Sequence, residues 1–165
     1  STPSNSSAAS DVYKRQIISY NGSKHVAVYG QGVYSESGEL IVDAAKISRL
    51  QVVDGMLYVL TDDGCIVYDG KNVAAVYDKA MGMYNTEAAS VIYGSFGRQT
   101  QDKLYIASHG AGIFVFADGK LEANIDENYG LPSKNVNDMA ANRQSANALK
   151  NDVLLFLLFG IFIVI

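Results

Sequence analysis

Residues 56–71, MLYVLTDDGCIVYDGK, decide the fold, because their pattern returns at residues 103–120, KLYIASHGAGIFVFADGK. In both stretches an apolar strand leads through a polar turn to a second apolar strand that ends at or near Asp-Gly-Lys. An earlier copy is visible around Tyr20, and the series Tyr20, Tyr68 and Phe116 advances by 48 residues at each step. Repeats with a period of this length are typical of propellers and other repeat arrays.

Each unit is predicted to hold four short antiparallel strands. In the unit that starts at Met56, turns at residues 61–64 and at Asp69-Gly70-Lys71 separate the apolar runs, and a longer loop spans residues 80–86. The four predicted strands are residues 56–60, 65–68, 72–77 and 87–93. Four antiparallel strands in a unit of about 40–50 residues are typical of a propeller blade. The sequence therefore predicts an all-β fold, a partial β-propeller of two to three blades over residues 17–144, with a period of about 48 residues.

The strands at residues 56–60 and 113–116 are apolar on both faces. A blade lies between two neighbouring blades, so both of its faces are buried and this composition is expected. Propellers typically have about four to eight blades. We therefore expect the natural protein to be longer, or this chain to assemble with copies of itself or to leave apolar edges uncovered.

Composition and charge exclude some classes of function. Hydrophobic residues make up 48% of the 165 residues, the net charge is −4, and the 13 Lys and Arg residues are scattered. Nucleic acid binding, which needs a basic patch, is therefore not expected. The single cysteine rules out an intrachain disulfide, and its apolar run, Cys65-Ile66-Val67-Tyr68, favours a small buried side chain over a nucleophile.

Both ends differ in composition from the repeats. Residues 1–16, STPSNSSAASDVYKRQ, have no hydrophobic period and no signal-peptide core, and we expect a non-native or disordered leader. Residues 145–165 form a hydrophobic tail of doubtful origin, in which residues 153–165, VLLFLLFGIFIVI, carry no charge. As a helix this run would span roughly 20 Å of a hydrocarbon core about 30 Å thick. It could be part of a transmembrane helix, a hydrophobic strand or an out-of-frame product.

Residues 129–136, YGLPSKNV, resemble the signature of the two-component regulator propeller repeat, in which a Gly-Leu-Pro-Ser-Asn-like loop precedes a Val-led strand. Residues 103–108, KLYIAS, resemble the Leu-Trp-Ile-Gly-Thr-like strand of that family, with Tyr in place of Trp. The resemblance extends over about residues 17–144 and is weak before Ile47. The loop at residues 82–85, GMYN, lacks the Pro-Ser pair, and the pattern stops after Asn142.

This resemblance implies a sensor. Propellers of the family are usually extracytoplasmic input domains of membrane-spanning bacterial signalling proteins, with a histidine kinase or a diguanylate cyclase as the output module. The implied partners are an unknown small ligand or protein and such an output module, with a membrane contact through residues 153–165. A protein-interaction scaffold is the alternative, and no feature of the sequence separates the two.

No catalytic, cofactor or metal site is predicted. The two histidines, His25 and His109, have no further ligands at metal spacing. The turn at residues 109–112, HGAG, is interpreted as a β-turn rather than an oxyanion-binding turn, because the repeat places it between two strands. Residues 61–64 are too short a series for a calcium loop, and residues 94–97 lack the ending of a phosphate loop. A propeller lyase or glycosidase, the least favoured alternative, needs clustered His and carboxylate side chains.

Loop carboxylates and tyrosines are the remaining candidates. Asp78 and Asp126-Glu127 occupy corresponding loops, where solvated turn residues are commoner than an acid–base pair. Four tyrosines near loops and strand ends could bind a sugar or a partner, although core packing is favoured: Tyr77, Tyr84, Tyr93 and Tyr129. The sequence thus identifies no ligand-binding residue.

Overall fold

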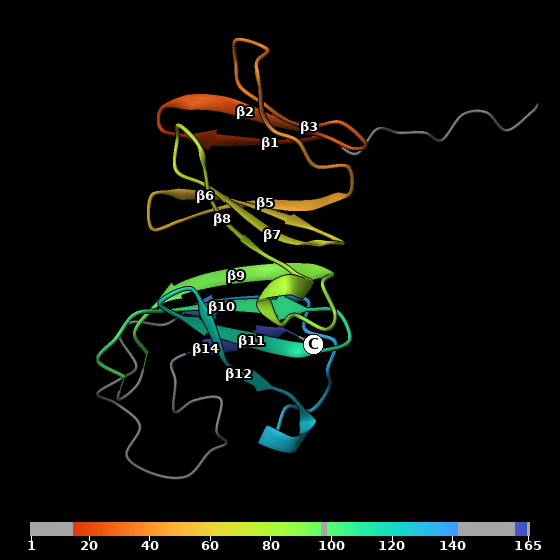
Figure 1. The fold of residues 1–165 in the computed structure, drawn as a ribbon, viewed down its shortest axis with the longest axis vertical. Helices are drawn as coiled ribbons and strands as arrows, with labels where there is room; N and C mark the ends of the chain where they lie inside the picture. The colour runs from red at the N-terminus through yellow and green to blue at the C-terminus, as the bar shows by residue number, and fades with distance from the viewer. Residues whose placement is uncertain (1–14, 97–98, 142–160, 165) are drawn as a thin grey trace, which may run out of the picture.

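The structure, a computed structural model, describes residues 15–96, 99–141 and 161–164, which form a series of antiparallel sheets (Figure 1). The first sheet contains β1 (Arg15–Tyr20), β2 (Ser23–Val28), β3 (Gly32–Tyr34) and β4 (Leu40–Val42). The second contains β5 (Ile47–Val53), β6 (Met56–Thr61), β7 (Gly64–Tyr68) and β8 (Val73–Tyr77). The third contains β9 (Ala88–Gly94), β10 (Lys103–Ser108), β11 (Gly112–Ala117) and β12 (Lys120–Ile125). A two-stranded sheet follows, made of β13 (Asp138–Ala141) and β14 (Ile161–Val164).

Two short 3₁₀ turns lie in the connections, η1 (Lys79–Met81) after the second sheet and η2 (Glu127–Tyr129) after the third. Within each four-stranded sheet the strands pair in chain order, and Figure 1 shows the sheets stacked along the long axis. The first strands β1, β5, β9 and β13 lie beside one another. Meander sheets arranged beside a line of first strands form a partial β-propeller, so the predicted fold class is confirmed.

The hydrophobic core lies between the sheets. In β6, Leu57 belongs to the cluster shared with the first sheet, whereas the next residue, Tyr58, belongs to the cluster shared with the third. Successive side chains of a strand point to opposite faces, so one strand contributes to two cores. A third cluster lies on the far side of the third sheet, around Tyr105 and Val136. This confirms that strands with two apolar faces are buried on both sides.

The predicted division of strands among the blades is wrong in one respect. The sequence pattern groups residues 87–93 with the unit of Met56, but β9 is the first strand of the third sheet. The second sheet instead begins with β5, which Asp54-Gly55 joins to β6. Both turn residues have positive φ (50° and 73°), as in the type I′ turn whose twist suits paired strands. The long loop at residues 78–87, and not the tight turn, therefore marks the boundary between blades.

The two ends of the chain are described only in part. β1 begins at Arg15, so the last residues of the expected leader lie in the first strand, while residues 1–14 lie outside the described residues. β14 comes from the hydrophobic tail and pairs antiparallel with β13, while residues 145–160 also lie outside. In the part of the chain that the structure describes, no helix has the length and apolar character needed to cross a membrane.

Side chains on the first strands bind backbone groups of the neighbouring first strand. Each first strand is paired within its sheet on one edge only. The N–H of Leu50 donates to Gln16 Oε1 (2.5 Å), and the N–H of Val91 donates to Gln51 Oε1 (2.7 Å). A buried donor left without a partner costs about 1–3 kcal/mol. These glutamines therefore take the place of a missing strand and fix the position of each sheet on the next.

Asp138 connects three first strands. Its Oδ1 accepts hydrogen bonds from Arg49 Nη1 on β5 (3.0 Å) and from Ser90 Oγ on β9 (2.7 Å). The N–H of Met139 donates both to this Oδ1 (2.9 Å) and to Ser90 Oγ (3.2 Å). Burial raises the pKa of the Asp138 carboxyl, but the hydrogen bonds from Ser90 and Met139 and the charge of Arg49 outweigh it, so the pKa lies below its usual value.

A glycine begins the third strand of each four-stranded sheet. Gly32, Gly64 and Gly112 have positive φ values of 135°, 138° and 82°. A Cβ at Gly64 would lie 2.2 Å from the carbonyl oxygen of Tyr77, the last residue of β8. At Gly32 and Gly112 the equivalent carbonyl would lie at 2.3 and 2.2 Å. Glycine is thus required where the third strand passes close to the end of the fourth.

We expect Gly64→Ala to lower the free energy of unfolding by about 2–4 kcal/mol, because the methyl group meets a backbone carbonyl and the positive φ is strained. Gly55→Ala is the matched control, since Gly55 also has positive φ but nothing lies within 4 Å of the position that its methyl group would take. The control should lose about 1 kcal/mol. Urea denaturation followed by circular dichroism measures both, and equal losses would contradict the close approach.

We expect Asp138→Asn to destabilise the chain at neutral pH and to have a smaller effect in acid. A carboxyl with a lowered folded-state pKa stabilises the fold above its unfolded pKa of about 4, and this contribution is lost as the pH falls through the folded-state pKa. The difference in urea midpoint between wild type and variant should therefore shrink from about pH 6 to about pH 3. Asp102→Asn, at an exposed carboxylate, serves as the control. If the difference in urea midpoint between wild type and Asp138→Asn does not change with pH, the ionised Asp138 carboxylate does not stabilise the fold.

Candidate functional site

The turn at residues 109–112 is held by the backbone of the next connection. The N–H groups of Gly110 and Gly112 both donate to the carbonyl oxygen of Lys134 (3.1 and 2.8 Å). Because these donors are occupied, they do not form an oxyanion-binding pair. His109 Nδ1 lies 2.9 Å from Glu87 Oε1, with 38% and 51% of the two side chains exposed. The residues therefore form the structural turn that the repeat predicts, with a contact between His109 and Glu87 at the surface beside it.

Two of the three loop carboxylates, Asp78 and Asp126, cap 3₁₀ turns, and the third, Glu127, is the first residue of η2. Asp78 accepts hydrogen bonds from the N–H groups of Ala80 (2.8 Å) and Met81 (3.3 Å) at the start of η1. Asp126 accepts one from the N–H of Asn128 (2.9 Å) at the start of η2. Each turn ends at a glycine with positive φ and leads to a buried apolar residue, Met83 or Leu131. The structure thus places the two carboxylates in separate loops, each as a helix cap.

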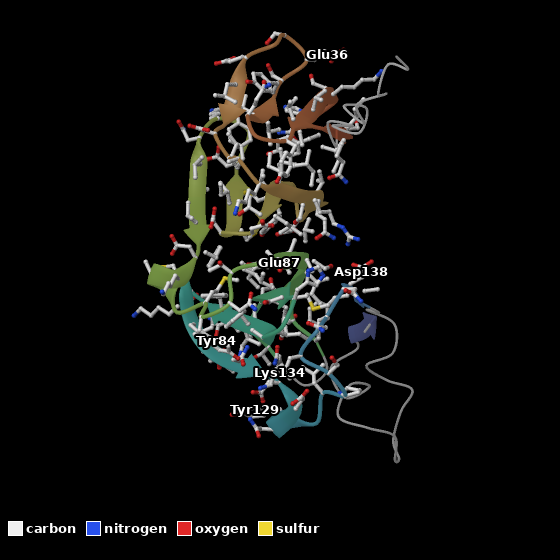
Figure 2. All side chains as sticks on the ribbon, turned by 90° about the vertical axis from the view of Figure 1, so that its right-hand side faces the viewer. Glu36, Tyr84, Glu87, Tyr129, Lys134 and Asp138 are labelled. Carbon is white, nitrogen blue, oxygen red and sulfur yellow. The ribbon has the colours of Figure 1, made fainter. Side chains whose placement is uncertain are left out.

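The four tyrosines fall into two pairs. Tyr77 packs on Phe116, with ring centroids 4.6 Å apart, and Tyr93 packs against the core between the second and third sheets. Tyr84 and Tyr129 are 62% and 57% exposed, and Figure 2 shows both on the same half of the molecule as Lys134. Core packing therefore accounts for Tyr77 and Tyr93. Tyr84, although largely exposed, meets the buried Phe114 edge to face, with ring centroids 5.3 Å apart, and its hydroxyl donates to Asn124 Oδ1 (2.9 Å).

The loop that lacks the Pro-Ser pair nevertheless makes the same turn. Ser133 Oγ accepts a hydrogen bond from the N–H of Asn135 (3.1 Å), and Asn85 Oδ1 accepts one from the N–H of Glu87 (3.2 Å). Asn85 Nδ2 also donates to the carbonyl oxygen of His109 (2.6 Å). Asn and Ser side chains both stabilise turns of this kind, so the departure in sequence leaves the local geometry unchanged.

A polar cleft of about 550 Å³ lies between the first and second sheets. Its most buried lining residues are Tyr20, His25 and Tyr68, which are 2%, 7% and 8% exposed and which we call the floor. The residues around it, which we call the rim, come mainly from the turn between β3 and β4, and Figure 2 shows Glu36 at the end of the molecule formed by the first sheet. Polar members of the rim are Asn21, Ser23, Ser35, Glu36, Ser37 and Glu39.

Ser35 organises the turn that carries the rim. Its N–H donates to the carbonyl oxygen of Glu39 (2.8 Å), and its Oγ accepts from the N–H of Glu39 (3.2 Å). Its Oγ also lies 2.8 Å from Ser37 Oγ. The N–H of Lys24 on β2 donates to Glu36 Oε2 (3.3 Å), which holds this carboxylate over the first sheet. The rim therefore has a defined conformation that its own hydrogen bonds maintain.

The floor is an aromatic cluster that joins the two sheets. The Tyr20 ring meets the rings of His25 and Tyr68 edge to face, at centroid distances of 5.5 and 6.3 Å. The Tyr20 hydroxyl donates to the carbonyl oxygen of Tyr68 (3.3 Å). Burial is the main cause that raises the pKa of Tyr20, and a hydrogen bond with Asn21 offsets it in part, so the hydroxyl stays protonated at neutral pH.

In the part of the chain that the structure describes, no three His, Cys, Asp or Glu side chains gather at ligand geometry. From the sequence, His25 was a histidine without further ligands at metal spacing, and no residue of the rim was a candidate for binding. The rim lies in the first unit, where the repeat is weakest. The signal that could have indicated it is the polar run at residues 35–39, SESGE, between two apolar strands.

Comparison with known proteins agrees with the fold. No family model matches the chain, and no curated protein matches it. Among solved structures the chain is similar to the extracellular domain of a hybrid two-component system protein, BT3049, from B. thetaiotaomicron, with a TM-score of 0.54 and 15% identity over 78% of this chain. The match covers 19% of that protein's chain, so this chain spans about a fifth of its length. At this identity the likeness establishes the propeller fold.

Cys65 is the small buried residue that the sequence predicts, with 0% exposure in the core between the second and third sheets. Burial raises the pKa of its thiol well above the usual range. We expect no reaction with a thiol reagent such as DTNB in the native chain at about pH 8, and rapid reaction in urea. Absorbance of the released thiolate measures both rates, and fast native labelling would contradict the buried position.

Proposed function

We propose that this chain is part of an extracytoplasmic ligand-sensing propeller of a membrane-bound bacterial signalling protein. The main support is the repeat itself, whose loop at residues 129–136 resembles the two-component regulator propeller repeat. The likeness to the extracellular domain of a hybrid two-component system protein agrees with this assignment. In the complete protein the propeller transmits ligand binding to a kinase or cyclase module.

The cleft between the first and second sheets supports a sensing role for this part of the propeller. Concave sites lined by aromatic residues and a few polar groups are the usual places for small ligands. The cleft is bounded by both sheets, so a ligand there contacts two blades at once. Binding would favour one relative position of the two sheets, which is the kind of differential contact that a signal requires.

A protein-interaction scaffold is the second candidate function. Its support is the pair of exposed rings, Tyr84 and Tyr129, on the half of the molecule that also carries Lys134. Exposed tyrosines are enriched at protein interfaces because they combine apolar area with a hydrogen-bonding hydroxyl. The scaffold and the sensor use different parts of the surface, so they can be tested separately.

The reading frame that encodes the chain tests the sensor proposal. We expect the frame, followed beyond both ends of residues 1–165, to contain further units of about 48 residues, a membrane-spanning segment and a kinase or cyclase module. The complete product, expressed in a bacterium, should expose its propeller to protease added to spheroplasts. A complete gene product without an output module would overturn the proposal.

A further inference from the structure

The ionisable residues that line the cleft favour a positively charged ligand. Glu36 and Glu39 stand on the rim, and His25 is the only other ionisable side chain of the lining apart from the tyrosines. No lysine or arginine is among the described residues that line it. Two carboxylates with no basic partner in the lining give the cleft a negative potential, which attracts cations.

His25 presents a hydrogen-bond acceptor in the same cleft. Its Nδ1 lies 3.3 Å from the carbonyl oxygen of Ser23, and a hydrogen bond to this oxygen requires a proton on Nδ1. Among the described residues Nε2 has no protein partner, although the side chain is only 7% exposed. His25 lines the cleft, and Nε2 is not among fully buried side-chain atoms without a partner, so this nitrogen retains contact with solvent. A ligand that donates a hydrogen bond fits this position.

We propose that the cleft between the first and second sheets binds a small protonated amine, a ligand class that specifies the sensing role proposed above and rests on it. The ammonium group donates to the rim carboxylates and to His25 Nε2. The rings of Tyr20 and Tyr68, which are 2% and 8% exposed, form the floor against which the ligand rests. The serine hydroxyls of the rim accept the remaining N–H donors.

Other ligand classes fit the lining less well. An anion would meet two carboxylates and no basic side chain of the lining. A divalent metal prefers several oxygen or nitrogen ligands at close range, and the described residues offer no such group of three. A neutral polar molecule uses the acceptors but gains nothing from the negative charge. The choice between an amine and a neutral polar ligand is therefore the one that experiment has to make.

The test compares two ligands of the same length and shape. Putrescine carries two ammonium groups, and 1,4-butanediol replaces them with hydroxyls. Isothermal titration of the 165-residue chain, whose folding is checked by circular dichroism, should detect putrescine and not butanediol. Raising the salt concentration should weaken putrescine binding, because the rim carboxylates are exposed to solvent.

Variants locate the binding. The double variant Glu36→Gln/Glu39→Gln keeps size and hydrogen-bonding capacity, and it should weaken putrescine binding roughly five- to tenfold, the effect of losing two exposed ion pairs. Glu127→Gln removes one exposed carboxylate at η2, far along the chain, and should leave the dissociation constant unchanged. His25→Phe, which keeps an aromatic ring on Tyr20, should weaken binding about threefold through loss of the acceptor.

Several results would overturn the amine proposal: no putrescine binding by the folded chain, equal binding of butanediol, or the same loss in Glu127→Gln as in the double variant. The last result would mean diffuse attraction to an acidic protein. These failures are separate from failure of the sensor proposal. If the reading frame encodes an output module but putrescine does not bind, the sensor proposal holds and the ligand belongs to another class. If the frame encodes no output module but putrescine binds, the amine proposal holds and the sensor proposal fails.

Discussion

A strand with apolar side chains on both faces can be buried only between two other sheets, and this constraint shapes the whole chain. Leu57 and Tyr58 show it at the level of neighbouring residues, because they enter different cores. Sheets of this kind must stack, and stacking brings their first strands into a line. The open edges of those strands then need hydrogen-bond partners, which Gln16 and Gln51 supply from one sheet to the next. Burial thus sets the stacking, and polar side chains set its register.

The sequence carries most of the fold but not the boundaries of the blades. The period, the strand positions and the buried Cys65 follow from residue pattern, since a repeat places the same residue types at the same structural positions. The grouping of residues 87–93 was wrong because the tight Asp54-Gly55 turn, and not the long loop at residues 78–87, joins strands of one sheet. A repeat pattern is the same whichever strand begins the unit. Only turn geometry decides which strands share a sheet.

The cleft was much harder to predict than the fold. Its floor joins Tyr20 to Tyr68, which the repeat relates to each other, but their contact depends on how two sheets pack. Its rim lies in the unit where the repeat is weakest. Equivalent positions also use different chemistry: the ion pair of Lys46 and Asp62 lies beside the second sheet, whereas Glu87 and His109 are paired beside the third. A pattern of residue types misses such equivalences, whereas the backbone geometry reveals them.

The link between Arg49 and Asp138 spans 89 residues, whereas the sheets pair strands that follow one another in the chain. Contacts between close neighbours in sequence form early at a small entropic cost, and contacts that close long loops form late. The sheets can therefore form one after another before the carboxylate of Asp138 pairs with the guanidinium of Arg49. One carboxylate thus joins β13 to β5 and β9 together, an arrangement that exists only where the second and third sheets are in register.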